Sequence, residues 1–344
     1  MEFQVINPSG YPDWDALLLR SGDASFFHTA AWARVLEETY GFKPNYFALI
    51  EAECFSLLMP MMEVNSPLKG KKGVSLPFTD RCAPHALRPE LLKAAVHRAV
   101  GHGEKHGWKS IEWRDNEYCA EGACPWETYH VHDIDLHNTE MGLFAKLSAT
   151  NRRNIKKAVR ERLTVRMGRS MDFMKSFYRL NCLTRKRHGL PPQPFVFFKR
   201  VFEHIISKDL GLVFCAYHAG RTIAASVFFH FGTKALFKYG ASEMRHQDLR
   251  PNNLLMWEAL KWYQDGGYET MSLGRTELNN PGLLQYKRTW GAKESVLNYF
   301  RYDVRKRGYL GKRPDRSEFY RNLFKRTPPS VLRVVGRLFY KHVG

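Results

Sequence analysis

Apolar positions recur along the chain at two spacings, and the two spacings predict helices and strands in alternation. Helical spacing predicts helices over about 14–20, 30–40, 89–106, 141–163, 171–188, 195–207 and 252–265. Alternating or continuous apolar runs predict strands over about 46–53, 55–62, 74–80, 110–114, 128–135, 211–217, 222–231, 234–241, 268–273 and 295–304. Lys69–Lys72 is predicted to be a polar loop. Strands that alternate with helices of this length are typical of α/β architecture with a mixed sheet.

Charge divides the chain into two parts. The 344 residues include 53 Lys and Arg against 34 Asp and Glu, which gives a net charge of +19. Residues 1–140 carry 13 basic and 20 acidic side chains, whereas residues 141–344 carry 40 basic and 14 acidic ones. We therefore predict one domain over 1–140, a second over 141–304 and a basic tail over 305–344. An anionic partner is expected for the second half, which could be a nucleic acid, a phosphate-bearing substrate, an anionic lipid or an acidic carrier protein.

Composition excludes several classes of protein. We find no run of about 20 apolar residues that would span a bilayer and no secretory signal at the N-terminus, so a cytoplasmic location is expected. Six cysteines in a chain of this length are expected to be thiols in a reducing compartment. Cys119 and Cys124 are a close pair without a second pair at comparable spacing, so no metal site is expected.

Residues able to bind anions and to catalyse gather between 239 and 291. Tyr239–Ser242 ends a predicted strand, and after Arg250 a predicted helix opens with Pro251 and Asn252. Pro suits the first turn of a helix, Asn suits its cap, and free N–H groups at a helix start can hold an anion. Arg275 directly follows a strand end, where α/β folds commonly place ligand residues. Lys287 could neutralise a phosphate or a developing oxyanion.

These motifs resemble the Fem family and its relatives among the GNAT-fold N-acyltransferases. The resemblance rests on Tyr239–Ser242, the helix opening at Pro251, Gly274–Thr276 and Tyr286–Gly291, and it extends over about residues 20–300. It implies two tandem GNAT-like domains, each a mixed, mostly antiparallel sheet flanked by helices. It also implies transfer of an acyl or aminoacyl group to an amine of a cell-envelope, lipid-linked or nucleotide-linked acceptor, as in peptidoglycan-bridge transferases and Fem-related proteins of exopolysaccharide systems.

The resemblance further implies roles for single residues. Lys287 matches the Lys of the family's Phe-Lys motif and would polarise the acyl carbonyl or stabilise the oxyanion. Arg275 would bind phosphate or carboxylate beside it, and Asp80 could assist deprotonation of the amine. The expected substrate-binding residues are Arg152, Arg185, Arg187, Tyr239, Asn252 and Trp290. We expect no tightly bound cofactor.

The acyl donor is left open among aminoacyl-tRNA, acyl-carrier protein and acyl-CoA. The stretch 245–250, before the helix that begins at Pro251, has no glycine. GNAT domains that use acyl-CoA normally have a glycine-rich loop there, so acyl-CoA is disfavoured. The tRNA-dependent Fem enzymes often carry a long helical arm in the second domain, and this sequence has no such insertion.

Two other functions compete with catalysis. The basic half favours a nucleic-acid-binding protein, although the sequence has no RNP, zinc-finger or basic-zipper pattern. The C-terminal segment 329–344 favours a peripheral protein of the inner membrane, because Arg333, Arg337 and Lys341 form one stripe of an amphipathic helix predicted over about 330–343. The alternative for this helix is docking on the protein's own core. The sequence does not predict an oligomeric state.

Overall fold

The structure is a computed structural model that describes residues 3–22, 25–115, 122–312 and 324–342. Cys119 of the cysteine pair and Val343 of the predicted C-terminal helix lie outside these residues. The chain divides into two compact units. Unit 1 comprises Met1–Tyr129, Val296–Pro314 and Leu338–Gly344, and unit 2 comprises His130–Ser295 and Asp315–Arg337. This division places residues 296–304 in unit 1, whereas the charge pattern predicted them in the second domain.

Unit 1 combines three α-helices with short strands. A four-stranded antiparallel sheet has the order β1-β3-β4-β7. Strands β2, β5, β6 and β8 pair side by side, with β8 also pairing with β15. The elements are β1 (Gln4–Ile6), α1 (Trp14–Arg20), α2 (Ala30–Tyr40), β2 (Lys43–Pro44), β3 (Tyr46–Glu51), β4 (Cys54–Met59), β5 (Met62–Ser66), β6 (Gly70–Val74), β7 (His85–Ala86), α3 (Pro89–His106), β8 (Trp108–Arg114) and β16 (Gly308–Leu310), with 3-10 turns η1 (Pro8–Gly10), η2 (Phe26–His28) and η6 (Tyr340–His342).

Unit 2 is built on strands in the order β10-β11-β12-β13-β14-β9. Neighbours from β10 to β13 are antiparallel, whereas β13 and β14 are parallel and are joined through α8. The elements are β9 (Glu127–Asp135), α4 (Glu140–Lys146), α5 (Ala149–Arg160), β10 (Thr164–Gly168), α6 (Met171–Arg187), α7 (Phe195–His204), η4 (Ile206–Lys208), β11 (Gly211–His218), β12 (Arg221–Phe231), β13 (Lys234–Ser242), η5 (Met244–Leu249), α8 (Pro251–Asp265), β14 (Thr270–Glu277), α9 (Pro281–Arg288) and α11 (Pro329–Phe339). The chain passes between the units along β9 and β15 (Lys293–Asp303) and again within α11.

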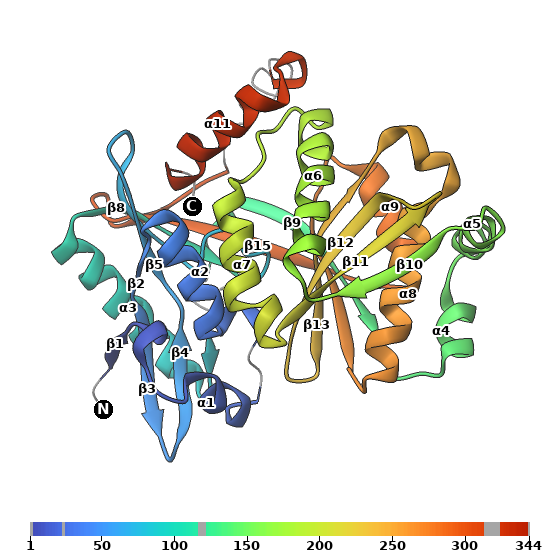
Figure 1. The fold of residues 1–344 in the computed structure, drawn as a ribbon. Coiled ribbons are helices and arrows are strands. Elements are labelled where there is room, and N and C mark those ends of the chain that lie inside the picture. The colour runs from blue at the N-terminus through green and yellow to red at the C-terminus, as the bar shows by residue number, and fades with distance from the viewer. Residues whose placement is uncertain (1–2, 23–24, 116–121, 313–323, 343–344) are drawn as a thin grey trace. The chain divides into compact units, whose positions relative to one another are not determined.

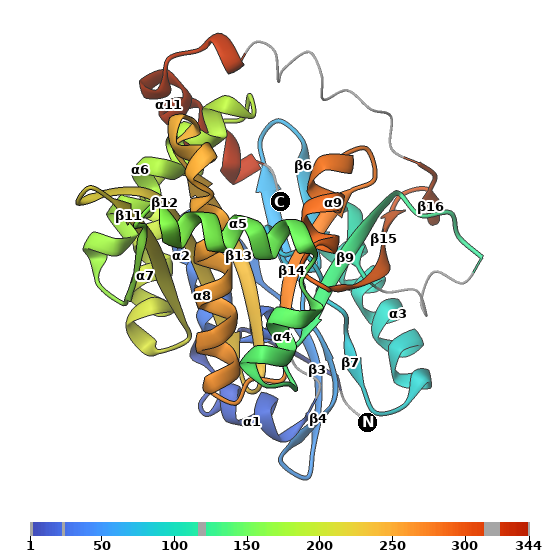
Figure 2. The same cartoon turned by 90° about the vertical axis from the view of Figure 1, so that its right-hand side faces the viewer.

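Helices cover both faces of the unit 2 sheet, with α6 and α7 on one face and α8 with α5 on the other (Figures 1 and 2). Successive side chains of a strand point to opposite faces, and neighbouring residues of β12 show this. The Phe228 ring lies 5.8 Å from the Tyr263 ring of α8, whereas the Phe229 ring lies 6.5 Å from the Tyr239 ring, which packs against α6 and α7. The core of unit 2 is therefore built from long apolar strands that are buried on both faces.

Several elements differ from the sequence-based prediction. The predicted strand over 74–80 ends at Val74 of β6, because Leu76 and Phe78 beyond it adopt the left-handed conformation, with φ of 54° and 60°. The predicted helix over 141–163 is two helices, because Leu147 is extended and the Ser148 hydroxyl accepts a hydrogen bond from the Asn151 N–H to begin α5 anew. The predicted polar loop Lys69–Lys72 lies largely within strand β6, which pairs with β5 and β8. Pairing on both sides outweighs the low strand propensity of its Gly and Lys residues.

Candidate functional site

Strands β13 and β14 separate toward their carboxyl ends. They pair only where Lys234–Leu236 faces Thr270–Ser272, although β13 continues to Ser242 and β14 to Glu277. A β-bulge in the pairing of β12 with β13, next to Val227, adds to the distortion of β13. Ligands of open α/β sheets bind beyond the carboxyl ends of the strands. A ligand site is therefore expected at this end of the unit 2 sheet.

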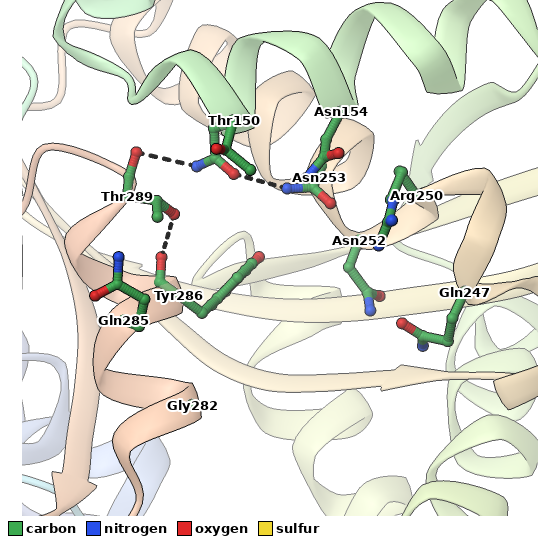
Figure 3. A pocket seen from close by; sticks show the side chains of 11 residues that line it. Thr150, Asn154, Gln247, Arg250, Asn252, Asn253, Gly282, Gln285, Tyr286 and Thr289 are labelled. Atoms are coloured by element: carbon green, nitrogen blue, oxygen red, sulfur yellow. Dashed lines mark hydrogen bonds between the residues drawn. The ribbon is translucent and has the colours of Figure 1, made fainter.

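A polar pocket of about 350 Å³ opens beside this end of β13. Its volume is at the lower end of the range that is typical for small-ligand sites. Arg250 is the charged member of a lining that consists otherwise of amides, hydroxyls and a glycine (Figure 3). The lining residues are Thr150, Asn151, Asn154, Gln247, Arg250, Asn252, Asn253, Gly282, Gln285, Tyr286 and Thr289. They come from α5, η5, α8 and α9, so four elements that are distant in sequence converge on the pocket.

Buried asparagines tie three of these elements together. The Asn253 amide on α8 donates to the Asn151 side-chain oxygen on α5 at 2.8 Å, and the Asn151 amide donates to the Thr289 carbonyl after α9 at 3.1 Å (Figure 3). Both asparagines are nearly inaccessible to solvent. Buried polar groups that are fully hydrogen-bonded fix the geometry around them, so the wall of the pocket is held rigidly by this chain of hydrogen bonds.

The N-terminus of α8 faces the pocket through Arg250, Asn252 and Asn253. Arg250 occupies the cap position in the left-handed conformation, with φ of 62°, and its side chain makes no capping hydrogen bond. The first N–H groups of a helix lie at its positive end. In α8, Pro251 has no N–H and the Asn253 N–H donates to the Arg250 carbonyl at 3.2 Å, which leaves the Asn252 N–H at this end. The Ser242 hydroxyl accepts hydrogen bonds from the Asn252 and Gln247 amides, at 3.2 and 2.5 Å. This arrangement suits a phosphate or another anion.

Glu243 anchors the η5 turn that carries Gln247 to the pocket. Its carboxylate is 5% exposed and lies within 3.3 Å of side-chain nitrogens of Arg179, Arg221, Arg245 and His246. Burial would raise the pKa of Glu243, but the hydrogen bonds from Arg179 and Arg245 and the charges of Arg221 and Arg245 outweigh burial and lower it to about 2. The turn is therefore fastened to β12 and α6 by a charged cluster.

Lys287 is buried, and its ammonium is bound to the backbone of β14. The Nζ atom donates to the Gly274 carbonyl at 2.7 Å and to the Arg275 carbonyl at 3.1 Å. Consecutive carbonyls of a regular strand point in opposite directions, so one ammonium reaches both only where the strand is distorted. Gly274 has φ of +71°, a conformation that glycine adopts without the steric cost that other residues incur. Lys287 and Gly274 together shape the separated end of β14.

A carboxylate beside Lys287 binds three cationic or ionisable side chains. Arg288 donates to Glu294 through Nε and Nη2 at 2.7 and 2.9 Å, while His130 Nδ1 and His132 Nε2 each lie 3.0 Å from its oxygens. The Arg288 hydrogen bond is the main cause that lowers the pKa of Glu294 to about 2. Burial of His132, followed by the charge of Lys287, lowers the pKa of this imidazole. The cluster fixes the end of α9 against β9 and the start of β15.

The predicted substrate-binding residues lie in several places. Asn252 lines the pocket. Tyr239 packs against Phe177 and Phe198 on the α6 and α7 face of the sheet, and Trp290 is 1% exposed within the core of unit 2.

The three predicted arginines make local contacts. Arg152 donates to the Ala145 carbonyl on α4, and Arg185 donates to the Pro191 carbonyl. Arg187, the last residue of α6, lies 3.5 Å from the Met244 sulfur. None of the three is among the residues that line the pocket in the described part of the chain.

Asp80 belongs to unit 1, whereas Arg275 and Lys287 belong to unit 2. The Asp80 carbonyl accepts a hydrogen bond from the Tyr299 hydroxyl at 2.5 Å, which fastens the loop after β6 to β15 within unit 1. Arg275 lies within β14, which continues to Glu277, and so does not follow the strand end as predicted. The Lys287 ammonium contacts the backbone carbonyl of Arg275.

Sequence reasoning missed Asn151, Asn253, Glu243 and the cluster at Glu294. Asn253 directly follows a residue that we had singled out, and Ser148 with Asn151 was a readable helix-capping signal. Glu243 offered no local signal, because the arginines around it lie up to 64 residues away in the sequence. Such a cluster becomes visible only when the strands are paired.

Comparison with known proteins gives the class of this fold. Residues 145–288 match the family model described as Acetyltransferase (GNAT) domain. No curated protein matches the chain. A crystal structure of FemX is similar with a TM-score of 0.68 at 13% identity, over 87% of this chain and 97% of that one. L-PGS from Bacillus licheniformis is similar with a TM-score of 0.55 at 13% identity, over 98% and 99%. A tandem GNAT protein from the clavulanic acid biosynthesis pathway has a TM-score of 0.54 at 10% identity, over 88% and 98%.

The fold is therefore a tandem GNAT fold, and the predicted fold class is confirmed. Unit 2 contains the acetyltransferase (GNAT) domain. The match over residues 145–288 identifies unit 2 as an acyltransferase domain, and the chain has a Fem-like GNAT fold.

Proposed function

We propose that unit 2 transfers an acyl or aminoacyl group from a phosphate-bearing donor to an amine of a cell-envelope, lipid-linked or nucleotide-linked acceptor. The observation that carries this proposal is the polar pocket at the N-terminus of α8, beside the separated end of β13. A phosphate placed there would meet the Asn252 backbone N–H, the side-chain amides of Asn252 and Asn253, and the positive charge of Arg250. All three candidate donors carry phosphate, so a pocket that suits phosphate supports a phosphate-bearing donor.

The reaction needs little from the protein beyond positioning and charge stabilisation. The amine nitrogen of the acceptor forms a bond to the acyl carbon, and the bond from that carbon to the donor's oxygen or sulfur breaks. The proton of the amine passes to the leaving group. Between these two events negative charge develops on the acyl oxygen, and hydrogen-bond donors placed around that oxygen lower the barrier.

For Lys287 we propose a positioning role, because its ammonium already donates to two carbonyls of β14. It would hold Gly274 and Arg275 so that the open end of the sheet keeps one shape. A positioning lysine and an oxyanion-binding lysine differ in how substitution affects stability, and that difference can be measured.

The test is product formation from each donor, followed by substitution of Arg250. Purified protein is incubated with aminoacyl-tRNA, acyl-carrier protein or acyl-CoA, together with lipid-linked and nucleotide-linked amine acceptors, and products are identified by mass spectrometry. We expect one donor to give an amide product, and Arg250→Gln to raise the KM for that donor several-fold with little change in kcat. Lys208→Gln, a surface lysine on η4, is the matched control. A KM that is the same in Arg250→Gln and wild type would contradict the placement of the donor phosphate.

A lipid-linked acceptor would present its amine at the inner surface of the membrane. We therefore propose that the enzyme works as a peripheral protein at that surface. No helix in the described part of the chain has the length and apolar character needed to cross a bilayer.

A further inference from the structure

The part of α11 that belongs to unit 2, up to Arg337, attaches to that unit by one narrow face. Leu332 is fully buried, and Gly336 lies so close to the Pro192 carbonyl oxygen that an added Cβ would come within 2.0 Å of it. These two residues are one turn apart, so they lie on the same face of the helix. Docking on the protein's own core, which the sequence left as an alternative, thus accounts for Leu332 and Gly336 but leaves most of the helix surface to be explained.

A second face of α11 is apolar and exposed. Val331, Val334 and Leu338 are spaced by three and four residues, so they form one stripe, which we call the outer stripe. Their exposed fractions are 48%, 58% and 58%. Apolar side chains of this size are seldom left so open in a row on one helix unless something covers them. The outer stripe is distinct from the face that carries Leu332 and Gly336.

A third face, next to the outer stripe, is cationic. At 100° per residue, Arg333 and Arg337 follow one another along α11 and border the outer stripe on the side away from Leu332, and Lys341 follows in the 3-10 turn η6. Residues 324–342 contain five Lys and Arg and no Asp or Glu. None of these five cations forms an ion pair with a carboxylate among the described residues.

We propose that α11 binds the surface of an anionic lipid bilayer through the outer stripe. The three apolar side chains would enter the boundary between headgroups and acyl chains, and the three cations beside them would meet the lipid phosphates. The argument for this partner is charge complementarity, because an apolar stripe bordered on one side by cations, which pair with no carboxylate of the described residues, matches a surface that is apolar below and negative above. A nucleic acid would use the cations but would leave the apolar stripe in water. This proposal does not depend on the identity of the donor or the acceptor.

Vesicle flotation with the full chain tests the proposal. Vesicles of phosphatidylcholine mixed with phosphatidylglycerol provide the anionic surface, and vesicles of phosphatidylcholine alone provide the neutral one. We expect the wild type to float with the anionic vesicles and to remain unbound with the neutral ones, with binding that weakens as salt is raised. We expect Val334→Glu/Leu338→Glu to bind about tenfold more weakly or worse, because two carboxylates then face the lipid.

Removal of positive charge tests the proposed contact between the cations and the lipid phosphates. Arg333→Gln/Arg337→Gln is expected to weaken binding to anionic vesicles about 25-fold, which is the factor for about 1 kcal/mol per cation near such a surface. The matched control is Lys156→Gln/Arg160→Gln, which removes two exposed cations of α5 and leaves α11 intact. A second control, Leu68→Glu, adds a carboxylate at an exposed apolar residue elsewhere. Both controls should bind like the wild type.

Several outcomes would overturn the proposal. One is flotation that is unchanged in Val334→Glu/Leu338→Glu, and another is equal loss in the α5 control, which would mean that overall positive charge and not α11 attracts the lipid. Equal binding to neutral and anionic vesicles would also contradict it. The substituted side chains are exposed, so thermal unfolding of every variant should match the wild type. Deletion of 329–344 is less informative, because it also removes Leu332 from the core.

Discussion

The hydrogen bonds of Lys287 allow a quantitative prediction for Lys287→Met. Methionine keeps the length and apolar stem of the side chain but removes the ammonium, so the Gly274 and Arg275 carbonyls lose their donor. Hydrogen bonds to a charged group contribute about 1.5–3 kcal/mol each, but the variant no longer has to bury a charge. We expect the two effects to leave a net loss of about 1–3 kcal/mol in the free energy of unfolding.

The expected loss in the free energy of unfolding is measurable by thermal unfolding. In a domain of 150–250 residues, 1 kcal/mol corresponds to about 2–4 °C in Tm, so Lys287→Met should unfold about 2–12 °C below the wild type. Lys261→Met is the control, because Lys261 makes only a surface ion pair with Glu258 on α8, and such pairs contribute about 0–1 kcal/mol. Differential scanning calorimetry of the three proteins gives the comparison.

The positioning role requires stability and activity to change together. With the productive donor, Lys287→Met should lose activity, and Lys287→Arg should recover part of both activity and Tm, because a guanidinium can still donate to two carbonyls. A large fall in kcat with no change in Tm would refute the reasoning and would favour a lysine that acts only on the oxyanion. Equal activity of wild type and Lys287→Met would refute any role of Lys287 in transfer.

Three further predictions concern the residues that shape the pocket. The pKa of Glu243 is lowered from 4.5 to about 2, so its contribution to stability is present above about pH 4.5 and is lost as the pH falls toward 2. Glu243→Gln should therefore lower Tm at pH 7 and flatten the decline of Tm with acid. Parallel curves of Tm against pH for the two proteins would contradict this. Asn151→Ala removes the hydrogen-bond partner of Asn253 and Thr289. It should lower the free energy of unfolding in urea by about 1–3 kcal/mol and raise the KM for the donor. An unchanged KM would show that the pocket wall keeps its shape without these hydrogen bonds. Gly274→Ala must hold a Cβ at φ of +71° and should cost about 1–2 kcal/mol, measured by calorimetry; no loss would mean that β14 relaxes without effect.

The sequence determined the local elements and the class of the protein. Periodicity placed α6, α8 and β11–β13 close to their observed bounds, because long apolar runs and clean amphipathic stripes are decided by burial. Arg275 and Lys287 are neighbours in space, although Arg275 lies inside β14 and not after its end as predicted. One prediction failed at Ser148, where a local capping signal ends one helix and begins the next. Another failed at Gly70–Val74, where pairing on both sides makes a strand of a polar stretch.

Only the tertiary structure decided which side chains meet. Asn151, Asn253 and Thr289 are separated by up to 138 residues, and the arginines around Glu243 come from α6, β12 and η5. The structure also showed that the ammonium of Lys287 is already engaged by backbone, and that α11 buries Leu332 while leaving Val331, Val334 and Leu338 open. Sequence periodicity reports which face of an element is apolar. It does not report which element will cover that face, because that depends on contacts between residues far apart in the chain.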